Sequence, residues 1–594
     1  MGQNNSSKKN VQKEYLNTKD QIAIGIDFGS CGITYAYGFL DNPRKEPFLG
    51  KFEEQGVNSK VSTEIILDDE LNKVLSFGND CNRFLSMTQN KVFHHFKNIK
   101  MNLYKRDYEV KARNSDRKVK VNYIITKILE LVKKKAIEQI KLSLPELDEK
   151  NIHWVITVPA IWEIKSKQIM INSAQEAGLI REDDDPSNFF ALEPEAASIY
   201  YHNSPHALKN KDIDSGQPFI LCDLGSGTAD IVTQKKVQEN GQIKFVELYP
   251  PVGGDCGCNN INENFMEKVI KELFGIKIFE KTKKDICKEN YYNWFEFENK
   301  IEEFKKSYRY KEEKDQHFII NCEIFKKYYS EKDLEKLINN FNANHKSWKL
   351  EIKEGWKINF PFQIINDLMQ ELIDRIEKEY LSKIVELRDD IKTLVFTGGA
   401  SANPILFEMI KSYKELNIKN YLKSPNPEVA IAYGSVLYSF DHYIISPRKA
   451  KYTFGIKTSD IWDEKKHKKG GIKIYDKKDK IYRCKNAFSK FITKNENLRP
   501  DKEICHKFIM NNSKANVQLY KTDKDNATFC DERDENGNII TTKFGEFIID
   551  VENKKFDESN KEVEVKMKLG GTFISASAIY CKTGDEFKIT CLYE

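Results

Sequence analysis

Two aspartates are the side chains best placed for chemistry. Each stands at the end of an apolar run and is followed by a turn of small residues. The motifs are DFGSCG at 27–32 and DLGSGT at 223–228. Their glycines let backbone N–H groups approach a polyphosphate with no Cβ in the way. A hard divalent cation prefers carboxylate and phosphate oxygens and often keeps its own waters. The turns therefore predict a nucleotide clamp in which Asp27 and Asp223 anchor a metal ion.

Buried strands must carry these two aspartates. The apolar runs at 22–26 and 219–222 have the length and composition of such strands. From residue 21 onward, apolar runs alternate with amphipathic stretches, which is typical of an α/β domain with parallel strands. The stretch 121–140 predicts one of the helices, because its apolar residues fall on one face. These residues are Ile125, Leu129, Val132 and Ala136.

The pattern changes to a period of two beyond residue 448. Val563, Val565 and Met567 alternate with charged residues, and Gly570-Gly571 supplies a turn before a second alternating run at 574–580. This pattern predicts a hairpin of half-buried strands. The aromatic residues near 294–304 have helix-like spacing and are expected in the core of a helical region.

Composition narrows the classes of function. The 594 residues suggest about four lobes. Lys plus Arg total 95 against 90 for Asp plus Glu, so no strong overall charge favours nucleic acid. No apolar run approaches the roughly 20 residues that span a bilayer, and no signal-peptide core is present, so we expect a cytoplasmic protein with free thiols. The absence of a GxxxxGK[ST] motif excludes a P-loop ATPase.

Three further motifs recur with the two turns in a characteristic order. They are WVITVPAIW at 154–162, ALEPEAAS at 191–198 and TLVFTGGASANP at 393–404. Together they resemble the nucleotide-binding domain of the 70-kDa heat-shock (DnaK-type) chaperones, within the actin, sugar-kinase and chaperone ATPase superfamily. Glu195, where typical members have threonine, and RKAKYTFG at 448–455 resemble the divergent branch of heat-shock family members 12A and 12B.

The resemblance implies an α/β fold in which a two-lobed actin-like ATPase domain is followed by a mainly β C-terminal domain. It divides the chain into a disordered polar tail at 1–20, nucleotide-binding lobe I at 21–210, lobe II at 211–447 with a helical subdomain at 276–375, and a β-rich substrate-binding-like domain at 448–594. Family members continue into a helical lid beyond that domain. We expect no lid in this sequence, which ends at Glu594.

The resemblance also implies a role for each turn, with ATP or ADP and Mg²⁺ as ligands. Phosphoryl transfer depends mostly on positioning and charge neutralisation. The implied catalytic residues are Asp27, Glu193, Asp223, Thr228 and a lysine, either Lys97 or Lys100. The implied nucleotide-binding residues are Gly29, Ser30, Cys31, Gly32, Gly225, Ser226, Gly227, Thr228, Gly253, Gly254, Glu302, Lys305, Lys306, Gly398, Gly399 and Ala400.

Two departures from the family pattern predict slow or absent hydrolysis. Ala402 stands where typical members have an arginine that stacks on adenine, and loss of a planar cation weakens contact with the base. Cys31 stands where threonine is usual, and its thiol is the weaker hydrogen-bonding group.

The sequence leaves three functions open. The first is an ATP-binding, heat-shock-70-like protein with nucleotide-dependent, chaperone-like contacts. Its partners would be client proteins at the β-rich domain and a co-chaperone or nucleotide exchange factor. The second is a catalytically inactive scaffold that nucleotide stabilises. The third is a small-molecule kinase of the same superfamily, which the β-rich C-terminal region argues against.

The first residues carry a separate signal. Gly2 after the initiator methionine, with Ser6 four residues on, fits the myristoylation pattern. One acyl chain binds membranes only weakly, so Lys8, Lys9 and Lys13 would supply the second attraction. The alternative is a disordered tail in which the glycine is accidental.

Overall fold

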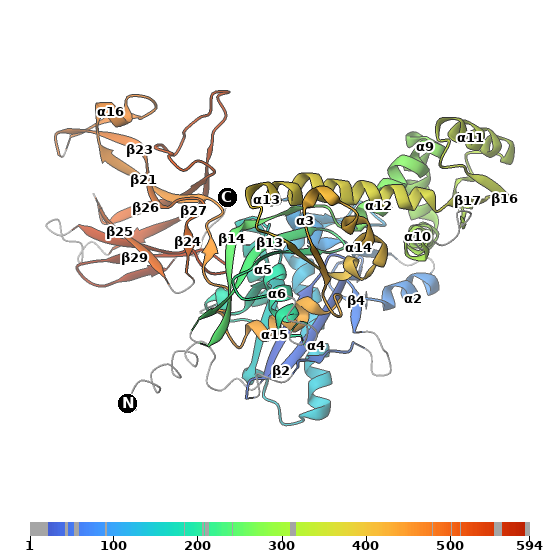
Figure 1. The fold of residues 1–594 in the computed structure, drawn as a ribbon, viewed down its shortest axis with the longest axis horizontal. Coiled ribbons are helices and arrows are strands. Elements are labelled where there is room, and N and C mark those ends of the chain that lie inside the picture. The colour runs from blue at the N-terminus through green and yellow to red at the C-terminus, as the bar shows by residue number, and fades with distance from the viewer. Residues whose placement is uncertain are drawn as a thin grey trace. The chain divides into compact units, whose positions relative to one another are not determined.

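The computed structural model describes residues 22–588, apart from 42–45, 53–58, 89–91, 183, 205–206, 208–212, 240, 309–316, 478, 500–501, 511 and 552–560. The predicted tail with Gly2 and the predicted boundary at 210–211 lie outside the described residues. The fold is mixed α/β, as the sequence predicted (Figure 1). The chain divides into unit 1, with residues 1–214, 218–231 and 252–441, and unit 2, with residues 215–217, 232–251 and 442–594.

The first sheet of unit 1 carries Asp27. Its strand order is β11 (Phe190–Leu192), β10 (Ile152–Val158), β1 (Ile22–Phe28), β2 (Gly32–Phe39) and β3 (Phe48–Leu49), with β4 (Lys60–Ser62) also paired to β2. β1 and β10 are parallel and buried along their whole length. β2 runs antiparallel to β1, so the DFGSCG turn joins two paired neighbours. Helix α15 (Ala430–Tyr438) packs against β1 and against α6 (Glu193–Asn203).

The second sheet carries Asp223. β12 (Pro218–Leu224) pairs in parallel with β18 (Thr393–Thr397), which pairs in parallel with β19 (Asn420–Lys423). β13 (Ala229–Glu239) and β14 (Gln242–Gly254) also belong to this sheet. Asp223 is in register with Thr397, so the turn after β12 lies beside the turn that begins at Gly398. Parallel strands end at one edge of a sheet, which brings these two turns together.

The segment 276–375 contains the predicted helices and a small sheet that the sequence did not predict. Its elements are α10 (Ile276–Ser307), β15 (His317–Asn321), α11 (Glu331–Asn344), β16 (Glu351–Glu354), β17 (Lys357–Pro361) and α12 (Gln363–Ile376). The strands form an antiparallel sheet in the order β15-β17-β16. Trp294, Phe295, Phe297 and Phe304 are buried, which confirms that these aromatic residues belong to a core.

The other elements of unit 1 form two further small sheets and several helices. They are β5 (Glu64–Asp68), β6 (Val74–Phe77), α2 (Asp80–Met87), β7 (Phe93–Lys97), α3 (Ile99–Tyr104), β8 (Glu109–Lys111), β9 (Lys118–Lys120), α4 (Val121–Ser143), α5 (Ile164–Glu176), α8 (Asn259–Phe265), α9 (Lys271–Phe274), α13 (Ser382–Leu387) and α14 (Pro404–Lys411). Helix α4 confirms the helix predicted at 121–140, with its four predicted apolar residues buried.

Unit 2 is built mainly from strands. From residue 448 on they are β20 (Arg448–Lys449), β21 (Thr453–Ile461), β22 (Lys473–Asp476), β23 (Ile481–Ile492), β24 (Asn497–Leu498), β25 (Glu503–Ile509), β26 (Lys514–Thr522), β27 (Thr541–Asp550), β28 (Glu562–Lys568), β29 (Ser575–Tyr580) and β30 (Glu586–Lys588), with one four-residue helix, α16 (Glu464–His467), among the described residues. The larger sheets have the orders β22-β23-β21-β26-β27 and β25-β28-β29-β30.

The hairpin predicted near the end of the chain is confirmed. β28 and β29 pair in antiparallel register, with Val563 opposite Tyr580 and Met567 opposite Ala576. Val563, Val565 and Met567 are buried, as their alternation with charged residues predicted. In the part of the chain that the structure describes, no helix has both the length and the apolar character required to cross a membrane.

Candidate functional site

A cavity of about 450 Å³ in unit 1 is lined by the turns that follow β1, β12 and β18. It brings together most of the residues that the sequence analysis selected. The selected residues that line it are Asp27, Gly29, Ser30, Cys31, Gly32, Lys100, Glu193, Asp223, Gly225, Ser226, Gly227, Thr228, Glu302, Lys305, Lys306, Gly398, Gly399 and Ala400.

The first glycine turn is fixed by its own backbone and by Thr63. The N–H of Gly29 donates to the carbonyl oxygen of Gly32 at 3.1 Å. The Thr63 hydroxyl donates to the Gly29 carbonyl at 2.6 Å, and the Thr63 N–H donates to the Cys31 carbonyl at 3.2 Å. Because these carbonyl groups already accept hydrogen bonds from protein, the turn is held in a defined conformation beside the cavity.

The second turn is fixed in a similar way by the start of α8. The N–H of Gly225 donates to the Thr228 carbonyl at 2.9 Å, and the N–H of Asn259 donates to the Ser226 carbonyl at 2.8 Å. A Cβ on Gly227 would overlap the Ser30 hydroxyl and the Met101 thioether. The two turns therefore approach closely at Gly227, where an added Cβ would require the Ser30 and Met101 side chains to move.

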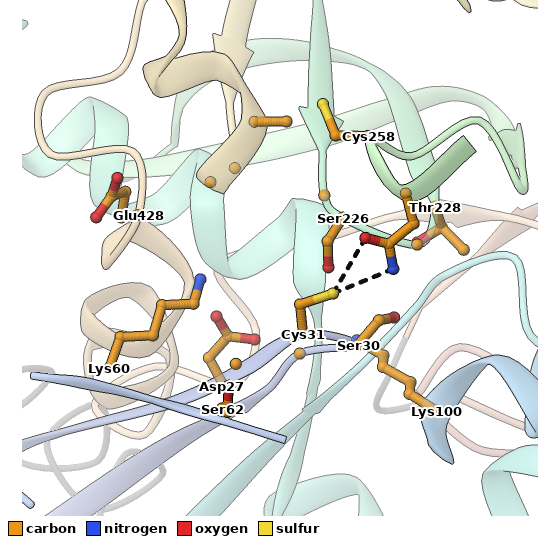
Figure 2. Close-up of a pocket in the computed structure, with 18 of the residues that line it drawn as sticks. Asp27, Ser30, Cys31, Lys60, Ser62, Lys100, Ser226, Thr228, Cys258 and Glu428 are labelled. Carbon is orange, nitrogen blue, oxygen red and sulfur yellow. Dashed lines mark hydrogen bonds between the residues drawn. The ribbon is translucent and has the colours of Figure 1, made fainter. Parts of the chain in front are cut away.

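A side-chain contact also links the two turns. The Cys31 Sγ lies 3.2 Å from Oδ1 and 3.1 Å from Nδ2 of Asn259, the first residue of α8 (Figure 2). A thiol is a weak donor and a weak acceptor, so this contact is weaker than the same contact made by a hydroxyl.

Four buried carboxyl groups, three of which line the cavity, influence one another. They belong to Asp27, Glu193, Asp223 and Asp230. Burial raises the pKa of each, and nearby carboxyl groups add to this rise for Glu193 and Asp223. Lys100, which is also buried, forms an ion pair with Glu193. Burial raises the pKa of Glu193, and the charge of Lys100 opposes this rise.

One carboxylate oxygen of Asp223 can accept a further hydrogen bond. Its Oδ1 is buried and has no hydrogen-bond partner in the described structure. A Cβ on Gly398, whose φ is +83°, would overlap this carboxylate, so both the left-handed backbone and the close approach require glycine there. Within the described ranges, no group of three His, Cys, Asp or Glu side chains could hold a metal ion directly. This donor set suits a cation such as Mg²⁺ that keeps several waters.

The opposite wall comes from α10 and α8. Glu302 accepts a hydrogen bond from the Asn262 side-chain amide at 2.6 Å and pairs with Lys305 at 2.6 Å and Lys306 at 3.3 Å. Burial tends to raise the pKa of Glu302, but Lys305, Asn262 and Lys306 lower it below its ordinary value. Lys305 also donates to the Cys258 carbonyl at 3.3 Å.

Three selected residues do not line the cavity. Lys97 instead pairs with Glu64 at 3.6 Å. Gly253 and Gly254 lie at the end of β14, where a Cβ would overlap the Ala229 carbonyl and the Tyr380 hydroxyl respectively. Of the two candidate lysines, the structure therefore places only Lys100 in the cavity.

The sequence analysis did not select several residues that line the cavity. They are Lys60, Val61, Ser62, Asn79, Cys258, Asn259, Met369, Asn403, Glu428 and Ile431. Most of them lie outside any sequence motif. Glu428 could have been predicted, because it ends a polar Asn-Pro-Glu triplet just before the apolar helix α15.

The fold and site define a mixed α/β protein with paired glycine turns over a buried cluster of carboxyl groups. No protein-family model matches the chain. It is 24% identical to heat shock 70 kDa protein 12A of Homo sapiens over 642 residues, which cover 96% of this chain and 91% of that protein, and the Mus musculus protein gives the same identity and coverage. Heat shock 70 kDa protein 12B of Homo sapiens is 26% identical over 313 residues, which cover 43% of this chain and 45% of that protein. These similarities confirm the resemblance to the divergent heat-shock-70-like branch.

Proposed function

We propose that this chain is a heat-shock-70-like protein that binds ATP or ADP with Mg²⁺ in the cavity of unit 1. The observation that carries the proposal is the pair of opposed glycine turns that line one cavity with the buried carboxyl groups of Asp27, Glu193 and Asp223. Within the described residues, Oδ1 of Asp223 has no hydrogen-bond partner. Backbone N–H groups and glycines suit a polyphosphate. The similarity to heat shock 70 kDa protein 12A, which extends over nearly the whole length of both chains, supports the same proposal.

Asp27 and Asp223 would hold the magnesium ion through water. The ion would neutralise charge on the phosphates and on the carboxyl cluster. Glu302, Lys305 and Lys306 would bind the nucleoside from one side, and Gly398, Gly399 and Ala400 from the other. All eight residues line the same cavity.

Hydrolysis is proposed to be slow or absent. Glu193 would orient the attacking water, but its carboxylate already forms an ion pair with the buried Lys100, which leaves it less available as a proton acceptor. The Cys31 thiol supplies only a weak hydrogen bond in the first turn. Ala402 does not line the cavity and offers no stacking cation.

The remaining proposals concern organisation and partners. Residues 21–447 would form the two-lobed, actin-like ATPase domain, and the strands from 448 on would form the domain that contacts client proteins as nucleotide is exchanged. A co-chaperone or exchange factor would assist it. The alternative is an inactive scaffold that nucleotide stabilises, which the features of Glu193, Cys31 and Ala402 favour. The protein would act in the cytoplasm, with myristoylated Gly2 giving reversible membrane contact.

Isothermal titration calorimetry tests the site. The wild-type chain should bind Mg-ADP, while Asp27→Asn and Asp223→Asn should each weaken binding by at least tenfold without unfolding the protein. Asp389→Asn, at an exposed turn outside the cavity, is the matched control. Equal binding by the wild type and both site variants would show that the site is assigned wrongly. Single-turnover hydrolysis of Mg-ATP would then separate a slow ATPase from a scaffold.

A further inference from the structure

Lys60 is a cavity residue that no motif predicted and that the proposed function has not used. It begins β4 and crosses the first glycine turn. A Cβ on Gly32 would lie only 3.0 Å from Cγ and 3.2 Å from Cδ of Lys60, so the aliphatic stem rests directly on the turn. The Nζ lies 3.4 Å from the position of a Cβ on Gly399. Lys60 therefore reaches from the turn after β1 to the turn after β18.

The ammonium group of Lys60 remains available to a ligand. Its Nζ makes no hydrogen bond or ion pair with the other described residues. Lys100, by contrast, is paired with Glu193, and Lys305 is paired with Glu302. Lys60 is close enough to Asp27 to lower its pKa, although burial has the larger, opposite effect.

Lys60 and Lys100 approach the carboxyl cluster from different directions. In the view of Figure 2 they lie on opposite sides of Asp27, with Lys60 on the same side as Glu428. An ammonium group has three donors and no acceptor, so the wall beside Gly399 offers positive charge to an anion. A phosphate group is the anion that the neighbouring glycine turns fit.

We propose that Lys60 binds the phosphates nearest the nucleoside, which ADP and ATP share. The inference rests on the proposed function, because it takes Gly399 to lie beside the nucleoside and the 29–32 turn beside the outer phosphates. The stem of Lys60 lies on the outer-phosphate turn while its Nζ lies beside Gly399, so its charge falls on the inner part of the polyphosphate. Lys100, which forms an ion pair with Glu193, would lie near the outer phosphates at the other end of the polyphosphate.

Binding of adenosine, ADP and ATP, each with Mg²⁺, tests this assignment. Lys60→Met keeps the stem on Gly32 and removes the charge. This variant should bind ADP and ATP more weakly by a similar factor of about 10 to 100, which is the range for a charge-assisted hydrogen bond. Its affinity for adenosine should change by less than about threefold. Lys73→Met, at an exposed turn outside the cavity, is the matched control. Lys60→Gln is a second uncharged variant in case the methionine variant does not fold.

Each other outcome overturns the assignment. Unchanged ADP affinity shows that Lys60 does not contact phosphate. A loss of affinity for ATP alone places Lys60 at the terminal phosphate. An equal loss of affinity for adenosine shows that Lys60 has a structural role. If the wild type binds ADP normally in these cases, only the Lys60 assignment fails. A wild-type chain that binds none of the three ligands overturns the proposed function as well.

Discussion

Replacing each of the two candidate lysines with methionine should separate a residue that stabilises the fold from one that serves the site. Lys97 ends β7 and lies 3.6 Å from the Glu64 carboxylate, with its Nζ 5.4 Å from the centre of the Phe295 ring. Glu64 is buried and also contacts Nε2 of His95 at 3.0 Å. Lys100, three residues on, lines the cavity and pairs with Glu193.

The size of the Lys97 effect follows from the ionisation of Glu64. Burial by itself would raise the pKa of this carboxyl group, but the hydrogen bond with His95 and the charge of Lys97 lower it to about 2. Relative to the ordinary value of 4.5, this favours the carboxylate by about 3 kcal/mol. His95 contributes more than Lys97, so Lys97→Met should lower the free energy of unfolding at pH 7 by about 1 kcal/mol.

The pH dependence has a definite sign. Because the pKa of Glu64 is lower in the folded protein than in the unfolded chain, the stabilisation is complete above about pH 4.5 and disappears as the pH falls toward 2. The difference between wild type and Lys97→Met should therefore be constant from pH 6 to 8. It should shrink below pH 4.5.

Urea unfolding and nucleotide titration of both variants provide the measurement. Lys97→Met should lose about 1 kcal/mol of stability and keep wild-type affinity for Mg-ATP. Lys100→Met should weaken Mg-ATP binding or single-turnover hydrolysis by at least tenfold, because it leaves Glu193 without its buried cation. The reasoning would be refuted by a Lys97→Met variant with full stability and impaired nucleotide binding, particularly if Lys100→Met behaved as wild type.

Three further predictions concern other parts of the molecule. Gly227→Ala should weaken Mg-ADP binding at least tenfold in calorimetry, because a Cβ there would displace the Ser30 side chain in the opposite turn, and normal affinity would show that the site tolerates this displacement. Ala402→Arg should tighten nucleotide binding by about 2- to 30-fold if a stacking cation is what the site lacks, and an unchanged Kd would show that this position does not reach the base. Gly2→Ala should release the protein from membrane fractions if the chain is myristoylated, and replacing the lysines at 8, 9 and 13 with glutamine should weaken attachment and its salt sensitivity. Intact-mass analysis that finds no acyl group on protein from its native cell would exclude this prediction.

The sequence by itself determined the features encoded in short segments. Asp27 and Asp223 could be placed at strand ends because an apolar run followed by small residues is a local signal. The helix at 121–140 and the hairpin around Gly570 could be predicted for the same reason, since the period of apolar residues selects helix or strand. The order of five motifs was sufficient for the family resemblance.

Tertiary structure alone decided which polar residues meet. Lys97 and Lys100 are equivalent in a sequence pattern, but Asn98 has a left-handed backbone, with φ of +58°, at the junction between β7 and α3. That junction leaves Lys97 beside β5 and turns Lys100 toward the carboxyl cluster. Lys60 and Asn259 reach the cavity through the pairing of β4 with β2 and through the start of α8, contacts between residues far apart in the chain. No local period records such contacts, because they depend on how separate elements pack rather than on neighbouring residues.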